Sequence, residues 1–373
     1  MGLGGLEAAL VATLDELIAA RGLAGAQISA RVGTGDRVDV ARGTCSDGTP
    51  MLASSRTPAF CLTKMLTAWA VLETCGAHAI DLETPAADVL PEFGRNGKRG
   101  IRLRHLLTNC AGIDESVVWP VMTKFGATAA EIYDAVCWAP LRAGWDPERR
   151  AYYDYTGAYT VLGVWLERVR GRAYREIVDE LVSRLGIAPG VIPAPLTGVS
   201  PWAPRAWTPQ NRLGAAAIER DSLAIAISGS PASGAVASAA ELCALWCALA
   251  DAADAGEAAP AIPGPIARRM CSSQRGRRFD EQFRLALDYG FGVMTSLADY
   301  QPWGLPAEFT ARTFGHVGLG VALVAAVPER RLVYAVLLNG LEYPKTENLR
   351  MQRALAATVC EHAPLADDAL TPA

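Results

Sequence analysis

The stretch that decides the fold is PAFCLTKMLTAWAVLETCG, residues 58–76. We expect it to form a helix from about Cys61 to about Cys75. Cys61 and Lys64 are three residues apart, which places them on one face of that helix. A helix N-terminus and a neighbouring ammonium both favour the thiolate, the reactive form of a cysteine. By itself this spacing is weak evidence for a catalytic pair, because a buried cysteine that only packs beside a solvated lysine has the same spacing.

The composition is that of an ordinary globular chain. Of the 373 residues, 51% are hydrophobic and 20% are charged, and the net charge is −4. We therefore expect neither nucleic acid nor an anionic membrane as a partner. No apolar run approaches the roughly 20 residues of a membrane span. The first residues, MGLGGLEAALVATLDELIAARG, have no basic segment and predict an amphipathic helix rather than a signal peptide.

The nine cysteines have no spacing typical of a metal site. Cys243 and Cys247 lie four residues apart, but no histidine pair or further cysteine completes a ligand set, which favours packing in the core. The odd number of cysteines and the lack of a secretion signal indicate free thiols in a reducing cytoplasm. We expect a cytoplasmic protein with no metal and no cofactor.

The order of elements predicts an α/β (α+β) fold. Two short strands, 26–32 and 37–43, are joined by the turn GTGD. Strands follow near the other end, at 310–317, 320–328 and 331–340, before a final helix at 346–362. Residues between these groups are mainly helical. The simplest arrangement is an antiparallel sheet flanked by the N- and C-terminal helices, built from 1–75 plus 231–373, with a helical insertion, 76–230, covering an active-site cleft.

Further motifs follow CLTK in a recognisable order. They are LRHLLTNCAG (103–112), YTGAYTVLGVWLERVRG (155–171), SGAVASAAELCAL (233–245), YGFGV (289–293) and FGHVGLG (314–320). Together they resemble the serine β-lactamase and penicillin-binding-protein superfamily, especially its class C-like esterase and transacylase branch. The resemblance extends from about Leu6 to about His362, and it implies the same β-lactamase/transpeptidase-like fold.

The resemblance implies roles for the residues of the first two motifs. Cys61 stands where the family has its acyl-accepting serine, and Lys64 would steady the thiolate or pass protons. A tyrosine would serve as general base and then acid. Tyr155 is preferred, with Tyr153 as the alternative. In either alignment the asparagine usual in this motif is absent. Asp154 either faces solvent or takes a role of its own.

The third motif implies the remaining catalytic groups. His316 would lie on the strand at the edge of the cleft. The backbone N–H groups of Cys61 and Leu319 would form the oxyanion hole, and Gly318 would let the strand approach the substrate. His105 has a scaffold role in the family, and we expect the same here.

Aromatic and basic residues complete the predicted site. Trp119 and Trp145 are candidates for substrate binding, among other tryptophans that mostly pack: Trp138, Trp202 and Trp207. Two basic stretches could dock an acidic carrier protein, although such stretches are usually solvated surface. They comprise Arg95, Lys98, Arg99, Arg102 and Arg104, and then Arg275, Arg277 and Arg278.

A cysteine nucleophile predicts a particular chemistry. Its acyl-enzyme is a thioester, so attack on an incoming thioester is nearly thermoneutral, and the intermediate reacts readily with amines. The leading hypothesis is an acyltransferase that takes an acyl group from a carrier-protein or coenzyme A thioester and passes it to a small-molecule amine. Such an enzyme would resemble the amide-forming condensing enzymes of lincosamide-type antibiotic biosynthesis. The alternatives are a hydrolase (an esterase, thioesterase or peptidase) and a catalytically silent binding protein.

Overall fold

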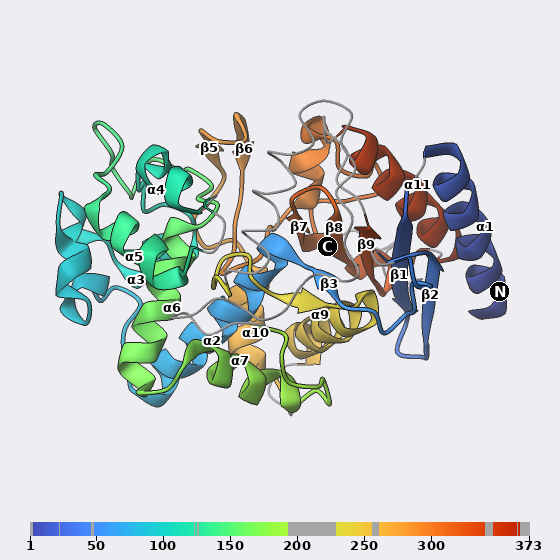
Figure 1. Ribbon diagram of the computed structural model, residues 1–373, viewed down its shortest axis with the longest axis horizontal. Helices are drawn as coiled ribbons and strands as arrows, with labels where there is room; N and C mark the ends of the chain where they lie inside the picture. Colours follow the sequence, from blue (N-terminus) through green and yellow to red (C-terminus); the bar gives the residue numbers. More distant parts are fainter. Residues whose placement is uncertain are drawn as a thin grey trace.

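The computed structural model describes residues 3–21, 23–45, 48–122, 124, 127–192, 229–255, 261–339, 346–363 and 365. Its centre is a five-stranded antiparallel sheet with the strand order β2-β1-β9-β8-β7 (Figure 1). The strands are β1 (Gly25–Val32), β2 (Arg37–Gly43), β7 (Phe314–Gly318), β8 (Ala322–Val327) and β9 (Leu332–Asn339). The first two strands of the chain therefore pair directly with its last strand.

The burial of each strand follows from its sequence. β8 and β9 consist almost entirely of apolar residues and are buried along their whole length, as expected for strands covered on both faces. β2 lies at the edge and alternates exposed with buried residues over its first half, which fixes its register against β1. In that register Ile28 pairs with Val40.

Helices cover the sheet (Figure 1). α1 (Leu3–Arg21) packs against β2 and against α11 (Thr346–His362), so the two ends of the chain meet. The hydroxyls of Thr13 and Thr358 lie 3.0 Å apart at this contact. α9 (Ala239–Ala255) packs against β1, β8 and β9. The sheet is thereby enclosed between helices from distant parts of the sequence.

The mainly helical segment lies beside the sheet. Its helices are α3 (Leu103–Leu107), α4 (Glu115–Met122), α5 (Ala129–Trp138), α6 (Gly157–Arg170) and α7 (Tyr174–Ser183). α2 (Thr63–Ala77) contacts α6, α7 and α10 (Gly264–Cys271). One continuous hydrophobic core includes residues of both the sheet and these helices. The division at residues 76 and 230 remains a prediction.

The predicted fold class is confirmed, and two local differences matter for the site. α2 starts at Thr63 rather than Cys61, because a single 3₁₀ turn, Phe60–Leu62, precedes it. A short hairpin, β5 (Arg278–Asp280) and β6 (Leu285–Leu287), was not expected from the sequence. Figure 1 shows this hairpin between the helices α3–α6 and the sheet.

Within the described residues, no helix is both long and apolar enough to cross a membrane. In the same ranges, no three His, Cys, Asp or Glu side chains are grouped so that they could hold a metal ion. All nine cysteines lie within the described part of the chain, and all are free thiols. Cys243 and Cys247 are buried in the core, with their sulfur atoms 3.8 Å apart.

Candidate active site

Cys61 lies in a tightly held turn, residues 58–63, which we call the nucleophile turn. It joins β3 (Thr57–Pro58) to α2. Phe60 has a φ of +49°, a strained conformation for a bulky residue that the surroundings must enforce. The Thr63 hydroxyl does so in part, because it donates to the Phe60 carbonyl at 2.5 Å and accepts from the Ala235 N–H at 3.0 Å. The thiol is thus fixed at the N-terminal end of α2, with only 8% of the residue exposed.

Lys64, the second residue of α2, is completely buried. Its Nζ donates to the carbonyls of Tyr155 at 2.9 Å and Ala232 at 3.3 Å. The same nitrogen lies 5.2 Å from the ring centre of Tyr153 and 5.3 Å from that of Tyr159. No described carboxylate forms an ion pair with it. Backbone carbonyls and aromatic rings therefore surround the Lys64 ammonium, and no described carboxylate neutralises its charge.

The structure distinguishes the two candidate tyrosines. Tyr153 is buried, and its pKa is raised well above the usual value, first by burial and then by the charge of Cys61 and a side-chain hydrogen bond with it. The Tyr155 hydroxyl instead accepts from the Gln282 amide at 2.9 Å. Burial is also the main cause that raises the pKa of Tyr155, to about 12. The preference for Tyr155 is therefore corrected, because Tyr153 is the one placed against the thiol.

His316 lies on β7, the strand at one edge of the sheet. The ring is fully buried on β7. Its Nδ1 lies 3.0 Å from the Val317 carbonyl and its Nε2 lies 2.9 Å from the Tyr289 hydroxyl. Burial, followed by the charge of Lys64, lowers the pKa of His316 to about 3. The imidazole is thus neutral, with Nδ1–H donating to the carbonyl and both nitrogens occupied. This placement gives it a positioning role and corrects the prediction of direct catalysis.

The two N–H groups of the predicted oxyanion hole come from the nucleophile turn and from the end of β7. β7 approaches the nucleophile turn so closely that a Cβ at Gly318 would lie 2.4 Å from the Ala59 carbonyl oxygen. Leu319 follows with a φ of +50°, which turns the chain at the end of the strand. Neither the Cys61 N–H nor the Leu319 N–H donates to a described backbone carbonyl outside its own element. Both donors are therefore available to a substrate oxygen.

A buried carboxyl pair lies behind the tyrosines. Glu115 and Asp154 hydrogen-bond through their side chains, and both are buried. The Asp154 carboxylate accepts from the N–H groups of Thr156 at 2.8 Å and Ala158 at 3.0 Å, at the start of α6. Glu115 accepts from the same Thr156 N–H at 3.0 Å. Burial and then the neighbouring Asp154 raise the pKa of Glu115 well above its usual range, so Glu115 holds a proton and Asp154 does not face solvent.

Aromatic rings pack around the two tyrosines, and we call four of them, Trp119, Tyr155, Phe283 and Trp303, the aromatic wall. The Tyr155 ring lies edge-on to Trp119, with 6.2 Å between ring centres, and 42% of Trp119 is exposed. On the other side, Phe283 lies 5.1 Å from Tyr153 and 5.3 Å from Trp303. Phe283 and Gln282 both come from the loop between β5 and β6. The hairpin and α4 thus provide two sides of an aromatic surface.

Trp145, the other tryptophan predicted to bind substrate, does not join this wall. The indole N–H of Trp145 donates to the Cys110 carbonyl at 2.8 Å, and its ring packs over Gly112 and under Arg150. This is a packing role, which corrects the prediction of substrate binding. Trp202 and Trp207 lie outside the described residues.

The two basic stretches are less exposed than expected. Lys98 is fully buried, and its Nζ donates to the carbonyls of Cys137 and Ala139 at the end of α5. Arg102 and Arg104 form ion pairs with Glu83. Lys98 therefore cannot belong to a solvated docking surface. His105 bonds to the backbone N–H of Arg102 at 3.1 Å and has the expected scaffold role.

Some residues of the site were not identified from the sequence. Gln282 and Phe283 lie on the unexpected hairpin, and the pairing of Glu115 with Asp154 joins residues far apart in the chain, so no local pattern could reveal either. Tyr289 did carry a signal, because it begins the YGFGV motif. Its position beside His316 was the missing information.

Comparisons with known proteins identify the family and the fold. The Beta-lactamase family model matches residues 10–358. Comparison with curated proteins gives no match. Among solved structures, SurE is 22% identical with a TM-score of 0.71, covering 98% of this chain and 77% of that one.

Two other structures extend the comparison. EstCE1, described as a hydrolase with promiscuous acyltransferase activity, is 17% identical with a TM-score of 0.68, covering 95% of this chain and 98% of that one. The D-amino acid amidase from Ochrobactrum anthropi SV3 is 13% identical with a TM-score of 0.73, covering 96% of this chain and 100% of that one. These likenesses show a shared fold. With a family model matched over residues 10–358, the chain belongs to the Beta-lactamase family.

Proposed function

We propose that this protein is a cysteine-dependent acyltransferase that takes an acyl group from a thioester and gives it to an amine. The observation that carries the proposal is the Cys61 thiol in the nucleophile turn, in contact with the buried Tyr153 hydroxyl and near the Lys64 ammonium. A thiol nucleophile exchanges with a thioester donor at little cost in free energy, whereas an ester or amide donor would start uphill.

The first half-reaction transfers the acyl group to sulfur. The Cys61 thiolate attacks the thioester carbonyl, and the N–H groups of Cys61 and Leu319 hold the resulting oxyanion. The carbon–sulfur bond of the donor then breaks, and the leaving thiolate takes the Tyr153 hydroxyl proton. The raised pKa of Tyr153 keeps the group a hydroxyl at rest, and the Lys64 ammonium, 5.2 Å from its ring centre, would stabilise the phenolate that forms when the proton leaves. In this half-reaction the negative charge moves from the Cys61 sulfur to the Tyr153 oxygen. The Lys64 ammonium lies close to the Tyr153 ring.

The second half-reaction releases an amide. The amine nitrogen attacks the Cys61 thioester, and the Tyr153 phenolate accepts the proton that the nitrogen loses. The bond between the carbonyl carbon and sulfur breaks, which regenerates the Cys61 thiolate. Over the cycle, a thioester and an amine become a thiol and an amide, and both residues return to their starting protonation states.

The proposed substrates follow from the surroundings. The aromatic wall, Trp119, Tyr155, Phe283 and Trp303, would bind an acceptor or acyl group with apolar surface. A carrier-protein or coenzyme A thioester in the cytoplasm would be the donor, and the nine free thiols support a reducing compartment. An amide-forming step of the lincosamide type in antibiotic biosynthesis would have this chemistry.

Intact-mass measurement tests the proposal directly. The protein is incubated with an acyl N-acetylcysteamine thioester, and a mass increase equal to one acyl group is expected. Cys61→Ala should abolish the increase. Cys75→Ala is the matched control, because it removes a different buried thiol, near the other end of α2, and should leave acylation unchanged. No adduct on the wild-type protein would favour a catalytically silent binding protein.

A hydrolase is the second candidate, favoured by the fold shared with an amidase and with a hydrolase that has acyltransferase activity. The two functions differ in how the acyl-enzyme decays. Acyl transfer predicts that millimolar amine speeds the loss of the adduct at least tenfold and yields amide. Decay at the same rate in buffer alone would identify a thioesterase. Cys61→Ser probes the need for sulfur, and undiminished amide synthesis by this variant would contradict the thioester argument.

A further inference from the structure

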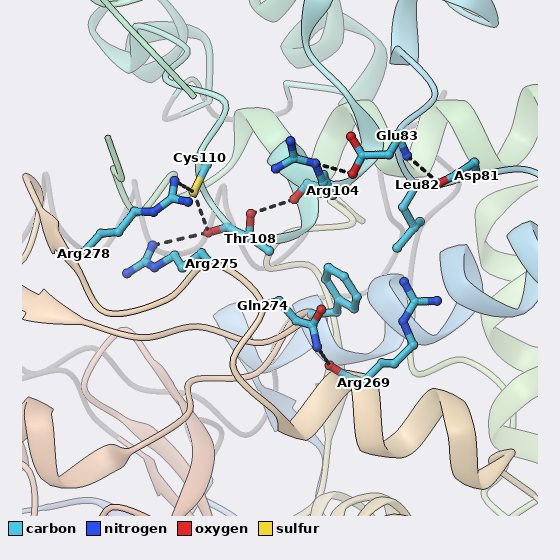
Figure 2. A pocket seen from close by; sticks show the side chains of 11 residues that line it. Asp81, Leu82, Glu83, Arg104, Thr108, Cys110, Arg269, Gln274, Arg275 and Arg278 are labelled. Atoms are coloured by element: carbon cyan, nitrogen blue, oxygen red, sulfur yellow. Dashed lines mark hydrogen bonds and ion pairs between the residues drawn. The ribbon is translucent and has the colours of Figure 1, made fainter. Parts of the chain in front are cut away.

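A small cavity of about 160 Å³ lies apart from the site described above (Figure 2). Part of its wall, Asp81 to Glu83, follows the C-terminal end of α2, whereas Cys61 precedes the N-terminal end. α2 has 15 residues, so its two ends are separated by about 22 Å. Four arginines line the cavity: Arg104, Arg269, Arg275 and Arg278. Residues of both predicted basic stretches therefore meet at this cavity, together with Arg269 of α10.

We call this cavity, lined by the four arginines, the arginine pocket. Only two of the four form ion pairs with carboxylates in the described part of the chain. Arg104 forms ion pairs with Glu83 and Glu148, and Arg275 pairs with Asp280 at 3.0 Å. The other two arginines, Arg269 and Arg278, have no ion pair with any carboxylate in the described ranges. Arg269 and Arg278 are therefore two guanidinium groups without a described carboxylate partner, at a cavity that the Asp81 and Glu83 carboxylates also line.

The contacts of these two arginines leave most of their donors available. Arg269 lies over the Phe291 ring at 5.4 Å, a contact that uses its face and not its N–H groups. Arg278 donates through Nη1 to the Pro147 carbonyl at 3.1 Å. Both residues retain further N–H donors, arranged as planar forks that suit the oxygens of an anion.

Arg275 adds a buried donor without an acceptor. Its side chain is 1% exposed, and its Nε has no hydrogen-bond partner in the described structure. A buried donor that is left unsatisfied loses the hydrogen bonds that water would otherwise supply. Such groups are uncommon in folded proteins and call for an explanation.

We propose that the arginine pocket binds a phosphate-class oxyanion, either inorganic phosphate or the phosphate of an ester. A phosphate dianion would balance the two free guanidinium charges, and its oxygens would accept from several arginines at once. The partly enclosed cavity keeps the charges from being fully screened by solvent. This binding does not depend on the proposed acyl transfer.

Ligand titration of the full-length protein tests the proposal. Phosphate should raise the melting temperature saturably at constant ionic strength, whereas chloride should not. Arg269→Ala and Arg278→Ala should each weaken phosphate binding at least tenfold. The matched controls are their neighbours Arg268→Ala and Arg277→Ala, which do not line the cavity and should change binding less than twofold.

Comparison of two ligands separates the sources of the phosphate. Tighter binding of 4′-phosphopantetheine than of inorganic phosphate, with no binding of pantetheine, would indicate an ester. The opposite order would indicate the free anion. No saturable effect of either ligand, or equal loss of binding in the control variants, would overturn the proposal. Circular dichroism of each variant confirms that the fold is intact.

Discussion

Glu115→Gln tests the account of the buried carboxyl pair through the pH dependence of stability. In the folded protein Glu115 keeps a proton that it shares with Asp154, because burial raises the pKa of Glu115 well above its usual range. In the unfolded chain an ordinary glutamate loses that proton near pH 4.3. Above this pH the folded state binds one more proton than the unfolded state, so stability falls with rising pH until the raised pKa is reached.

The magnitude follows from the difference of one proton. Each pH unit changes the free energy of unfolding by about 1.4 kcal/mol. If the pair keeps its proton through pH 7, the contribution lost between pH 5 and pH 7 is about 2.7 kcal/mol. Glutamine keeps a donor to Asp154 without a proton to lose, so it removes this dependence. The free energy of unfolding of the variant, relative to wild type, should therefore rise by about 2.7 kcal/mol between pH 5 and pH 7.

Urea unfolding at pH 5, 6 and 7 measures this difference. All other titrating groups are shared, so subtraction isolates the pair. Glu361→Gln, at an exposed position of α11, is the control and should follow wild type at each pH. A difference between Glu115→Gln and wild type that stays constant within about 0.5 kcal/mol would refute the shared proton.

Three further predictions concern the tyrosines, the strand edge and an exposed ion pair. Tyr153→Phe should slow amide formation by about 10²–10⁴-fold, the usual effect of losing a general acid–base group, whereas Tyr155→Phe should slow it less than tenfold; single-turnover kinetics compares them. Gly318→Ala should slow acylation of the thiol by about 10²–10³-fold, because a Cβ 2.4 Å from a backbone oxygen of the nucleophile turn displaces β7, and acylation followed by mass spectrometry checks it. The hydrogen bond from Arg104 is the main cause that lowers the pKa of Glu148 to about 2, so the stability that this carboxylate contributes is present above about pH 4.3 and is lost as the pH falls toward 2. Urea midpoints of Glu148→Gln and wild type should therefore converge over that range, and a gap that persists at pH 2 would contradict the assignment.

The sequence was sufficient for the sheet because local patterns determine it. Ile28 and Val40 belong to strands joined by a short turn, and β8 and β9 are continuous apolar runs. The site was harder to predict from the sequence. Tyr153 and Tyr155 are two residues apart in a segment without regular structure, so only the contacts of their hydroxyls distinguish them. Likewise, the burial of Lys98 depends on carbonyls of α5, which no local pattern near Lys98 reveals.

The hairpin formed by β5 and β6 offers a route to engineering. It contributes Phe283 to the aromatic wall and a hydrogen bond from Gln282 to Tyr155, yet it contributes none of the groups proposed to carry the reacting charge, Cys61, Lys64 and Tyr153. Its loop could therefore be exchanged or randomised as a cassette while the chemical machinery stays constant. Libraries limited to residues 281–284 would be a compact starting point for evolving the range of acceptors.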